Sequence, residues 1–329
     1  MQEATNHPFD RLTPDFLLAA VESQGLWCNG RQLALNSYEN RVYQIGIEDA
    51  EPVIAKFYRP GRWSDEQIRE EHDFCLELAG HELPVVAPWQ NANGETLFHH
   101  DGFRFALFPR RGGRAPELGD LDSLFTIGRL MGRIHLVGSA KAFTSRPTLD
   151  LDSYGYRSVA LIEEGFIPES LEASYQAASK ELLALVAEKW SAVGDITYIR
   201  THGDCHVGNM LWREDLPHFV DFDDARMAPA IQDLWMLLSG DRRDQVSQVS
   251  EVVAGYEEFF EFHPRELKLI EPLRALRMLH HTAWLASRWD DPAFPRAFSW
   301  FNTERFWGEH IMELREQCAV LREPPLTLA

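Results

Sequence analysis

Near the start of this chain, several apolar runs alternate with polar positions as in strands, whereas further on apolar residues mostly recur with the spacing of a helix. Alternating apolar and polar positions between turn-forming residues predict strands at residues 42–47, 52–58 and 103–108. Helix start and stop signals bound helices at residues 14–25 and 64–79. Ser64 and Gln67 stand three positions apart at the second of these helices and predict a capping box. We therefore expect an N-terminal part that mixes strands and helices.

Helical spacing dominates the remainder of the chain. It predicts helices at residues 121–137 and 169–192, and a mostly helical region at residues 231–321. Short strands are predicted at residues 197–200, 210–212 and 219–220. The segment 109–113 (PRRGG) breaks regular structure and is a candidate hinge. The pattern thus predicts two lobes, residues 1–109 and residues 110–329.

Composition narrows the range of partners and compartments. The 51 acidic against 32 basic residues give a formal charge of −19, which disfavours nucleic acid and anionic membranes as partners. The four cysteines are scattered without a Cys-x-x-Cys pair, so a disulfide framework or a structural zinc is not expected. Residues 1–6 lack the pattern of a signal peptide, and no apolar run reaches membrane-spanning length. We expect a soluble protein of the cytoplasm.

Two short segments carry side chains suited to phosphoryl transfer. They are residues 201–209 (THGDCHVGN) and residues 219–224 (FVDFDD), and the predicted short strands surround the first of them. Transfer from ATP needs a carboxylate that takes the proton of the acceptor hydroxyl, and an amide oxygen and a second carboxylate that hold Mg²⁺. Asp204, Asn209 and Asp221 have these types in this order. A single Asp or Asn in a loop usually has a role in a turn or a helix cap, but such a role does not explain why all three occur near these short strands.

Lys56 and Glu71 form a second candidate pair. Lys56 lies in an alternating strand (VIAKFY) like the strand whose lysine holds ATP phosphates in kinases. Such a lysine needs a carboxylate partner on the following helix, where Glu70 and Glu71 compete. Glu71 shares helical spacing with apolar Ile68, so it is expected on the buried face, while Glu70 turns aside.

Other interpretations of the same segments stay open. His202, Asp204 and His206 could be a metal-ligand triplet of a metallohydrolase, although the only other clusters of histidines are the adjacent pairs 99–100 and 280–281. Asp223 or Asp224 could replace Asp221 as the metal ligand. Asp233 either caps the start of an apolar helix or is a buried anchor for the backbone amides of the 201–209 loop.

These strings resemble the kinase-like phosphotransferases that include aminoglycoside phosphotransferases, choline kinases and homoserine kinases. That family shows His-Gly-Asp-x-His-x-x-Asn, then Ile/Val-Asp, then an Asp that opens a helix. The resemblance implies an α+β, bilobal protein-kinase-like fold, with a small antiparallel-sheet lobe for the nucleotide and a larger helical lobe for the substrate. It implies Asp204 as the proton acceptor, Asn209 and Asp221 as Mg²⁺ ligands, Lys56 with Glu71 as the phosphate-binding pair, and a loop over the ATP phosphates formed by Ser37, Tyr38, Glu39 and Asn40.

Further blocks, such as residues 56–60 (KFYRP), 291–295 (DPAFP) and 322–325 (REPP), resemble a subfamily of bacterial serine/threonine protein kinases. This resemblance implies a protein substrate and a role in stress responses and protection from cell death. The chain departs from eukaryotic protein kinases because it lacks a Gly-x-Gly-x-x-Gly loop, and only eleven residues separate Asp221 from Asp233. No long activation segment is therefore present to dock a peptide.

The runner-up is a small-molecule kinase of the same fold that acts on an amino alcohol, a sugar or an antibiotic. A cationic acceptor could be held by Glu257, Glu258 and Glu261 near Trp284 and Trp289. A third interpretation is a nucleotide-binding regulator without catalysis, which the complete set of candidate residues disfavours. One chain carries every residue that the chemistry requires, so we expect a monomer.

Overall fold

The computed structural model describes residues 7–329; residues 1–6, on which the expectation of no signal peptide rests, lie outside this range. The chain forms two compact units. Of the described residues, unit 1 comprises 7–116, 143–146 and 207–225, and unit 2 comprises 117–142, 147–206 and 226–329. Each unit is thus assembled from segments far apart in the sequence.

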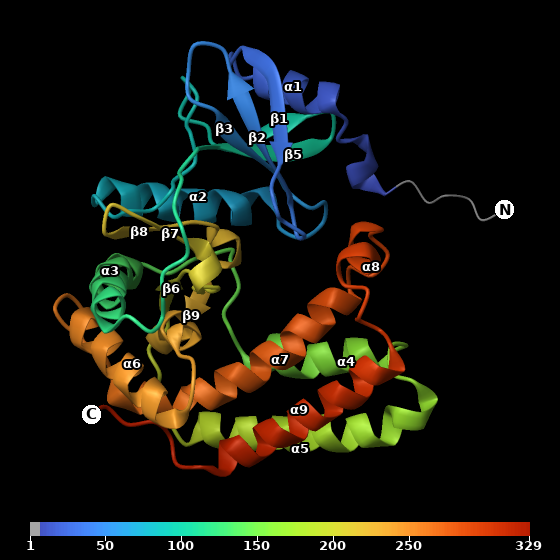
Figure 1. The fold of residues 1–329 in the computed structure, drawn as a ribbon, viewed down its shortest axis with the longest axis vertical. Helices are drawn as coiled ribbons and strands as arrows, with labels where there is room; N and C mark the ends of the chain where they lie inside the picture. Colours follow the sequence, from blue (N-terminus) through green and yellow to red (C-terminus); the bar gives the residue numbers. More distant parts are fainter. Residues whose placement is uncertain (1–6) are drawn as a thin grey trace. The chain divides into compact units, whose positions relative to one another are not determined.

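A five-stranded antiparallel sheet forms the centre of unit 1 (Figure 1). Its strands, in the order β1-β2-β3-β5-β4, are β1 (Cys28–Ala34), β2 (Arg41–Ile47), β3 (Val53–Phe57), β5 (Phe103–Pro109) and β4 (Phe98–His100). The predicted strands β2, β3 and β5 are confirmed within one or two residues. The strands β1 and β4 were not predicted; β1 has a polar sequence (CNGRQLA) and is largely exposed.

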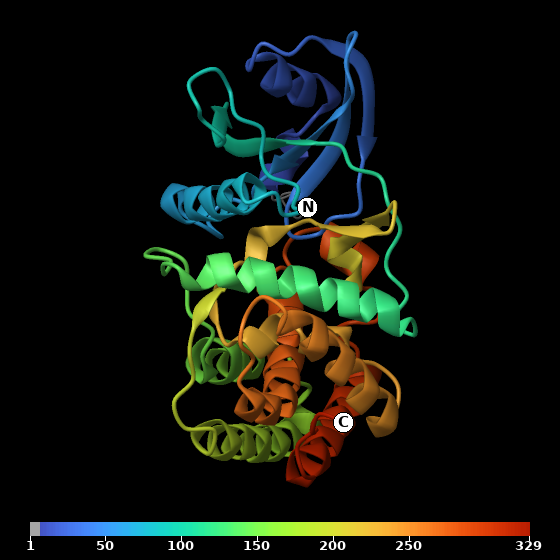
Figure 2. The same ribbon diagram turned by 90° about the vertical axis from the view of Figure 1, so that its left-hand side faces the viewer.

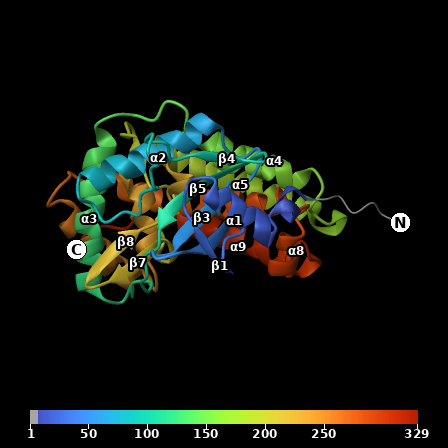
Figure 3. The same ribbon diagram turned by 90° about the horizontal axis from the view of Figure 1, so that it is seen from above.

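The sheet has a helix packed on each face. The helix α1 (Pro14–Glu22) lies beside the sheet (Figure 3). It packs on one face against inward-pointing residues such as Ile45, Phe57 and Phe105. The residues that alternate with these, Lys56 and Tyr58 among them, point to the other face, where Ile68 of α2 (Asp65–Gly80) packs. The alternation of β3 therefore directs Lys56 toward α2.

Both helices begin as their sequences indicate. Ser64 Oγ accepts a hydrogen bond from Gln67 N, and Gln67 Oε1 accepts one from Ser64 N, so the predicted capping box is present. The helix α1 ends at Glu22, three residues earlier than predicted, and Gly25 after it has a positive φ of 79°.

A hairpin completes unit 1. The strands β7 (Met210–Arg213) and β8 (Leu216–Phe219) pair in antiparallel fashion, with Met210 opposite Phe219. Glu214 and Asp215, which join the strands, both have positive φ, as a tight two-residue hairpin turn requires. The hairpin places the residues just before β7 opposite those just after β8.

Unit 2 is mostly helical, as predicted, and contains one small two-stranded sheet. Its helices are α3 (Leu121–Ser139), α4 (Arg157–Glu163), α5 (Glu172–Ser191), α6 (Arg242–Tyr256), α7 (Ile270–Ala286), α8 (Ala293–Ala297) and α9 (Glu304–Arg322). The strands β6 (Ile199–Thr201) and β9 (Arg226–Ala228) pair in antiparallel fashion. Among helices of the described range, none is both long and apolar enough to cross a membrane.

Close helix contacts hold unit 2 together. The helices α3 and α6 cross where Gly128 and Gly132 meet the backbone of Val252 and Tyr256 (Figure 2). A Cβ at Gly128 would lie 2.1 Å from the Val252 carbonyl oxygen, so only glycine permits this approach. The helices α5 and α9 run side by side (Figure 1).

Candidate active site

Lys56 of β3 is surrounded by three carboxylates within unit 1. Its Nζ lies 2.8 Å from Asp221 Oδ1, 3.1 Å from Asp223 Oδ1 and 4.0 Å from Glu71 Oε1. Burial alone would lower the pKa of Lys56, but the three carboxylates outweigh it and raise that pKa well above its ordinary value. Lys56 is therefore positively charged and lies between acidic groups.

Glu71 lies on the buried face of α2, as its spacing predicted. It is 1% exposed, and Arg146 Nη1 lies 3.6 Å from Oε2. Burial raises the pKa of Glu71 to about 7, and Lys56 offsets only part of this rise. Of the three carboxylates, Glu71 lies farthest from Lys56 Nζ.

Asn209 and Asp221 are brought to one end of the β7–β8 hairpin. Val220 N donates a 3.0 Å hydrogen bond to Asn209 O, which extends the pairing of Met210 with Phe219 by one position. Asp221 then leaves the hairpin with a left-handed φ of 61°, a conformation that non-glycine residues rarely adopt outside functional or turn positions. Its side chain is 52% exposed.

This donor set suits a hard divalent cation. A half-exposed carboxylate and a nearby amide residue supply the oxygens that Mg²⁺ prefers, with room for several waters. Asp223 Oδ1, which lies 3.1 Å from Lys56 Nζ, adds a buried carboxylate oxygen. Within residues 7–329, no group of three or more His, Cys, Asp or Glu side chains is arranged as a metal site.

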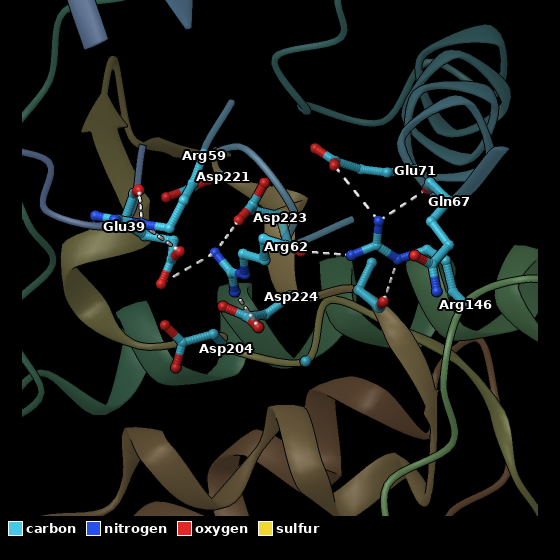
Figure 4. Close-up of polar contacts among 12 residues, drawn as sticks. Glu39, Arg59, Arg62, Gln67, Glu71, Arg146, Asp204, Asp221, Asp223 and Asp224 are labelled. Carbon is cyan, nitrogen blue, oxygen red and sulfur yellow. Dashed lines mark hydrogen bonds and ion pairs between the residues drawn. The ribbon is translucent and has the colours of Figure 1, made fainter. Parts of the chain in front are cut away.

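Arg62 links the acidic end of this hairpin to the loop before β2 (Figure 4). Its guanidinium bonds the Asp223 carboxylate, lies 2.9 Å from Asp224 Oδ1 and lies 3.7 Å from Glu39 Oε2. Burial would raise the pKa of Asp223, but Arg62 and Lys56 outweigh it and lower that pKa to about 2. Asp223 and Asp224 are thus engaged by Arg62, whereas Asp221 is not.

The predicted phosphate loop, residues 37–40, is braced by a second arginine. Arg59 Nε lies 3.0 Å from Glu39 Oε1, and Arg59 also donates to the carbonyls of Tyr38 and Glu39. Asn40 Oδ1 accepts a hydrogen bond from Arg59 N, and Ser37 is half-buried. The carboxylate of Glu39 is thus turned toward arginines, and the backbone amides of the loop are the kind of group that binds phosphate.

Arg146 was missed by sequence reasoning, although it is the most enclosed cation of the group (Figure 4). Its side chain is fully buried. It donates to the carbonyls of Gln67 on α2, Ala225 at 2.5 Å and Asp223, which fixes the segment after Asp221 against α2. The sequence around residue 146 carries no motif that would have revealed this role.

In unit 2, the loop that carries Asp204 is anchored by Asp233. The buried Asp233 carboxylate accepts hydrogen bonds from His202 N at 2.7 Å and Gly203 N at 2.8 Å, and it contacts His135 Nε2 at 3.0 Å. Gly203 has a φ of 83°, which explains the glycine before Asp204. The anchor interpretation of Asp233 is therefore confirmed. The predicted apolar helix at Asp233 is wrong, because two short 3-10 turns occupy residues 230–237.

Asp204 itself is partly exposed and has two cationic or titratable neighbours. Arg277 Nη1 of α7 lies 2.5 Å from Asp204 Oδ1, and His206 Nε2 lies 3.4 Å from Oδ2. His202 is buried, and its Nδ1 accepts a hydrogen bond from Asp204 N. The two histidines thus contact the loop and its carboxylate as braces. Arg277 was not predicted.

Comparison with known proteins shows the class of protein to which this chain belongs. Residues 31–270 match the model of the phosphotransferase enzyme family (APH). The chain belongs to this family and is an ATP-dependent phosphotransferase, that is, a kinase.

The chain is 48% identical to stress response kinase A of Escherichia coli O157:H7, with 97% of each chain covered. It is 46% identical to the serine/threonine protein kinase RdoA of Salmonella typhimurium, again over 97% of each. Among solved structures, amicoumacin kinase hAmiN in complex with AMP-PNP and Ca²⁺ superposes with a TM-score of 0.69 at 18% identity, covering 91% of this chain and 94% of that one. An aminopropanol kinase gives 0.68 at 18%, covering 93% and 96%. These structures confirm the predicted kinase-like fold.

Proposed function

We propose that this protein is a serine/threonine protein kinase that uses Mg²⁺ and ATP and acts in a bacterial stress response. The names of relatives 46–48% identical along almost the whole chain support this assignment. The observation that carries it is the contact of Lys56 with Asp221, 165 residues apart in sequence, which joins a phosphate-binding lysine to a metal-binding carboxylate.

Residues of the N-terminal lobe, 1–109, would bind the nucleotide, and residues 110–329 would carry the catalytic loop and bind the substrate. Lys56, held by Glu71, binds the α- and β-phosphates, and the backbone amides of residues 37–40 cover them. Asn209 and Asp221 hold Mg²⁺, which neutralises charge on the phosphates when bound. Asp204 accepts the proton of the acceptor hydroxyl.

A location in the cytoplasm is part of this proposal. The monomeric state also stays part of this proposal. Of the residues suggested for a cationic small acceptor, Glu258 pairs with Arg129, while Trp284 packs against Phe294 and Phe298. These contacts favour a solvent-exposed helix face around Glu258 and a packed aromatic cluster around Trp284 over a pocket for a cationic acceptor.

The test is transfer of labelled γ-phosphate from magnesium-ATP to a generic protein and to the enzyme itself. Asp204→Asn should lower transfer by about 10²–10⁴-fold with ATP affinity nearly unchanged, because the base acts on the acceptor. Asp221→Asn should also weaken binding of magnesium-ATP. Wild-type turnover in Asp204→Asn would refute the assignment of the base. Label on a metabolite but never on protein would replace the protein substrate with a small molecule.

A further inference from the structure

Arg277 of α7 is bound to the carboxylate of Asp204. The 2.5 Å contact joins side chains that are 39% and 23% exposed, so the pair lies at the surface of unit 2. The nearby Arg274, one turn earlier on the same helix, pairs instead with Glu271. Arg277 is therefore the arginine of α7 that turns to the catalytic loop.

The following inference rests on the proposed role of Asp204 as the base that accepts the proton of the acceptor hydroxyl. A base must touch the acceptor hydroxyl, so a group bound directly to the base lies beside the acceptor. We propose that Arg277 selects acceptors with an anionic group next to the hydroxyl. In a protein substrate, this is a Ser or Thr flanked by Asp or Glu.

The chemistry of the side chain supports this choice. A guanidinium stays charged at all relevant pH values and binds carboxylates through two parallel hydrogen bonds. An acidic residue of the substrate can accept the hydrogen bond that Arg277 now donates to Asp204. This exchange removes the Arg277 hydrogen bond from Asp204 Oδ1, the oxygen that then accepts the hydroxyl proton. A cationic acceptor, such as an amino alcohol, would instead meet a like charge.

In the transfer step, the oxygen of the acceptor hydroxyl forms a bond to the γ-phosphorus of ATP while the hydroxyl proton passes to Asp204. The bond from the γ-phosphorus to the bridging oxygen breaks, and ADP leaves with the electron pair. Arg277 remains paired with the acidic side chain of the substrate during this step and holds the acceptor in place.

The experiment compares three peptides that share one Ser and one length but carry Asp, Ala or Lys on both sides of it. For the wild-type enzyme, kcat/KM should be about tenfold or more higher with Asp than with Lys, as expected for one charge pair at a partly exposed site. Arg277→Glu should reverse this order, and Arg277→Lys should keep a weaker preference for Asp. Arg305→Glu makes the same charge change on a side chain that is 85% exposed on α9, and should leave the order unchanged.

Equal ratios in the wild type and Arg277→Glu would overturn the inference, as would a uniform loss of kcat on all three peptides. Absence of transfer to any peptide, while ATP hydrolysis still depends on Asp204, would overturn it as well. Asp204→Asn is measured in parallel. If that variant stays active, the proposed function itself fails; if it is inactive while the peptide ratios are flat, only the role of Arg277 fails.

Discussion

Glu70 and Glu71 are consecutive residues of α2, and their carboxylates have different partners. Glu71 is buried and contacts Lys56 and Arg146. Glu70 accepts hydrogen bonds from the backbone N–H groups of residues 144–146 at 2.6–2.8 Å. Glu70 therefore positions the segment that carries Arg146, and Arg146 in turn contacts Glu71. One turn of α2 thus fixes both the lysine pair and the segment after Asp221.

Glu71→Gln should separate activity from stability. The neutral side chain cannot hold Lys56 electrostatically, so kcat/KM for magnesium-ATP should fall about tenfold or more. The melting temperature should change little, because burial already raises the pKa of Glu71 to about 7 and the ionised form gains little from this site. Kinetics and thermal unfolding of the same samples test this. Glu66→Gln, an exposed change on the same helix, is the control, and a large loss of stability in Glu71→Gln alone would contradict the argument.

Arg146 should control how well the enzyme uses its metal. Arg146→Met removes the hydrogen bonds to the carbonyls of Gln67, Asp223 and Ala225, which releases the segment after Asp221. The Mg²⁺ concentration for half-maximal activity should rise several-fold, and Arg146→Lys should fall in between because it keeps only the charge. A purely structural role would lower the melting temperature and leave the Mg²⁺ requirement unchanged. Arg69→Met, a half-exposed arginine on α2, is the matched control.

Local features were predictable because their causes lie within a few residues. The capping box of Ser64 and Gln67 and the inward orientation of Glu71 follow from spacing along one helix. The arrangement around Asn209 and Asp221 follows from a hairpin of ten residues. The capping box agrees with the structure to the residue, whereas the second strand of the hairpin, predicted at residues 219–220, runs from Leu216 to Phe219.

The arginine contacts could not be predicted because they join distant segments. Arg62 and Asp223 are 161 residues apart, and Arg277 and Asp204 are 73 apart. A lone arginine has no periodicity or motif that identifies its partner. The helix expected at Asp233 failed for a related reason, since the buried contacts of this carboxylate with a distant loop override the local apolar pattern.

Asp233→Asn should weaken the catalytic loop. The Asp233 carboxylate is fully buried and accepts hydrogen bonds from two backbone N–H groups. The side-chain amide of Asn has one acceptor oxygen, so its NH2 group would face one of these N–H groups and leave that donor without an acceptor. The free energy of unfolding should fall by about 2 kcal/mol, and kcat should fall with it. Denaturant unfolding measures the first effect. Asp241→Asn, at the N-cap of α6, should cost almost nothing because Asn caps a helix as well as Asp; equal losses in both variants would remove the special role of Asp233.

His72 should make the stability of the protein depend on pH below neutrality. Its ring is fully buried between Tyr58 Oη at 2.7 Å and Thr96 Oγ1 at 2.8 Å. Burial, followed by the charges of Lys56 and Arg146, lowers the pKa of His72 from 6.5 to about 3. Below pH 6.5, His72 therefore binds a proton in the unfolded chain but not in the folded protein. Stability is complete above that pH and falls as the pH drops toward 3.

Between pH 6.5 and 5 this single histidine should lower the free energy of unfolding by about 2 kcal/mol. His72→Gln, which can still bond Tyr58 and Thr96, should be less stable at pH 7.5 but show a flatter dependence down to pH 5. Urea unfolding at a series of pH values, followed by circular dichroism, measures both slopes. His99→Gln replaces an imidazole that is 54% exposed and should keep the wild-type slope. A wild-type slope in His72→Gln would show that the ring takes up its proton in the folded protein.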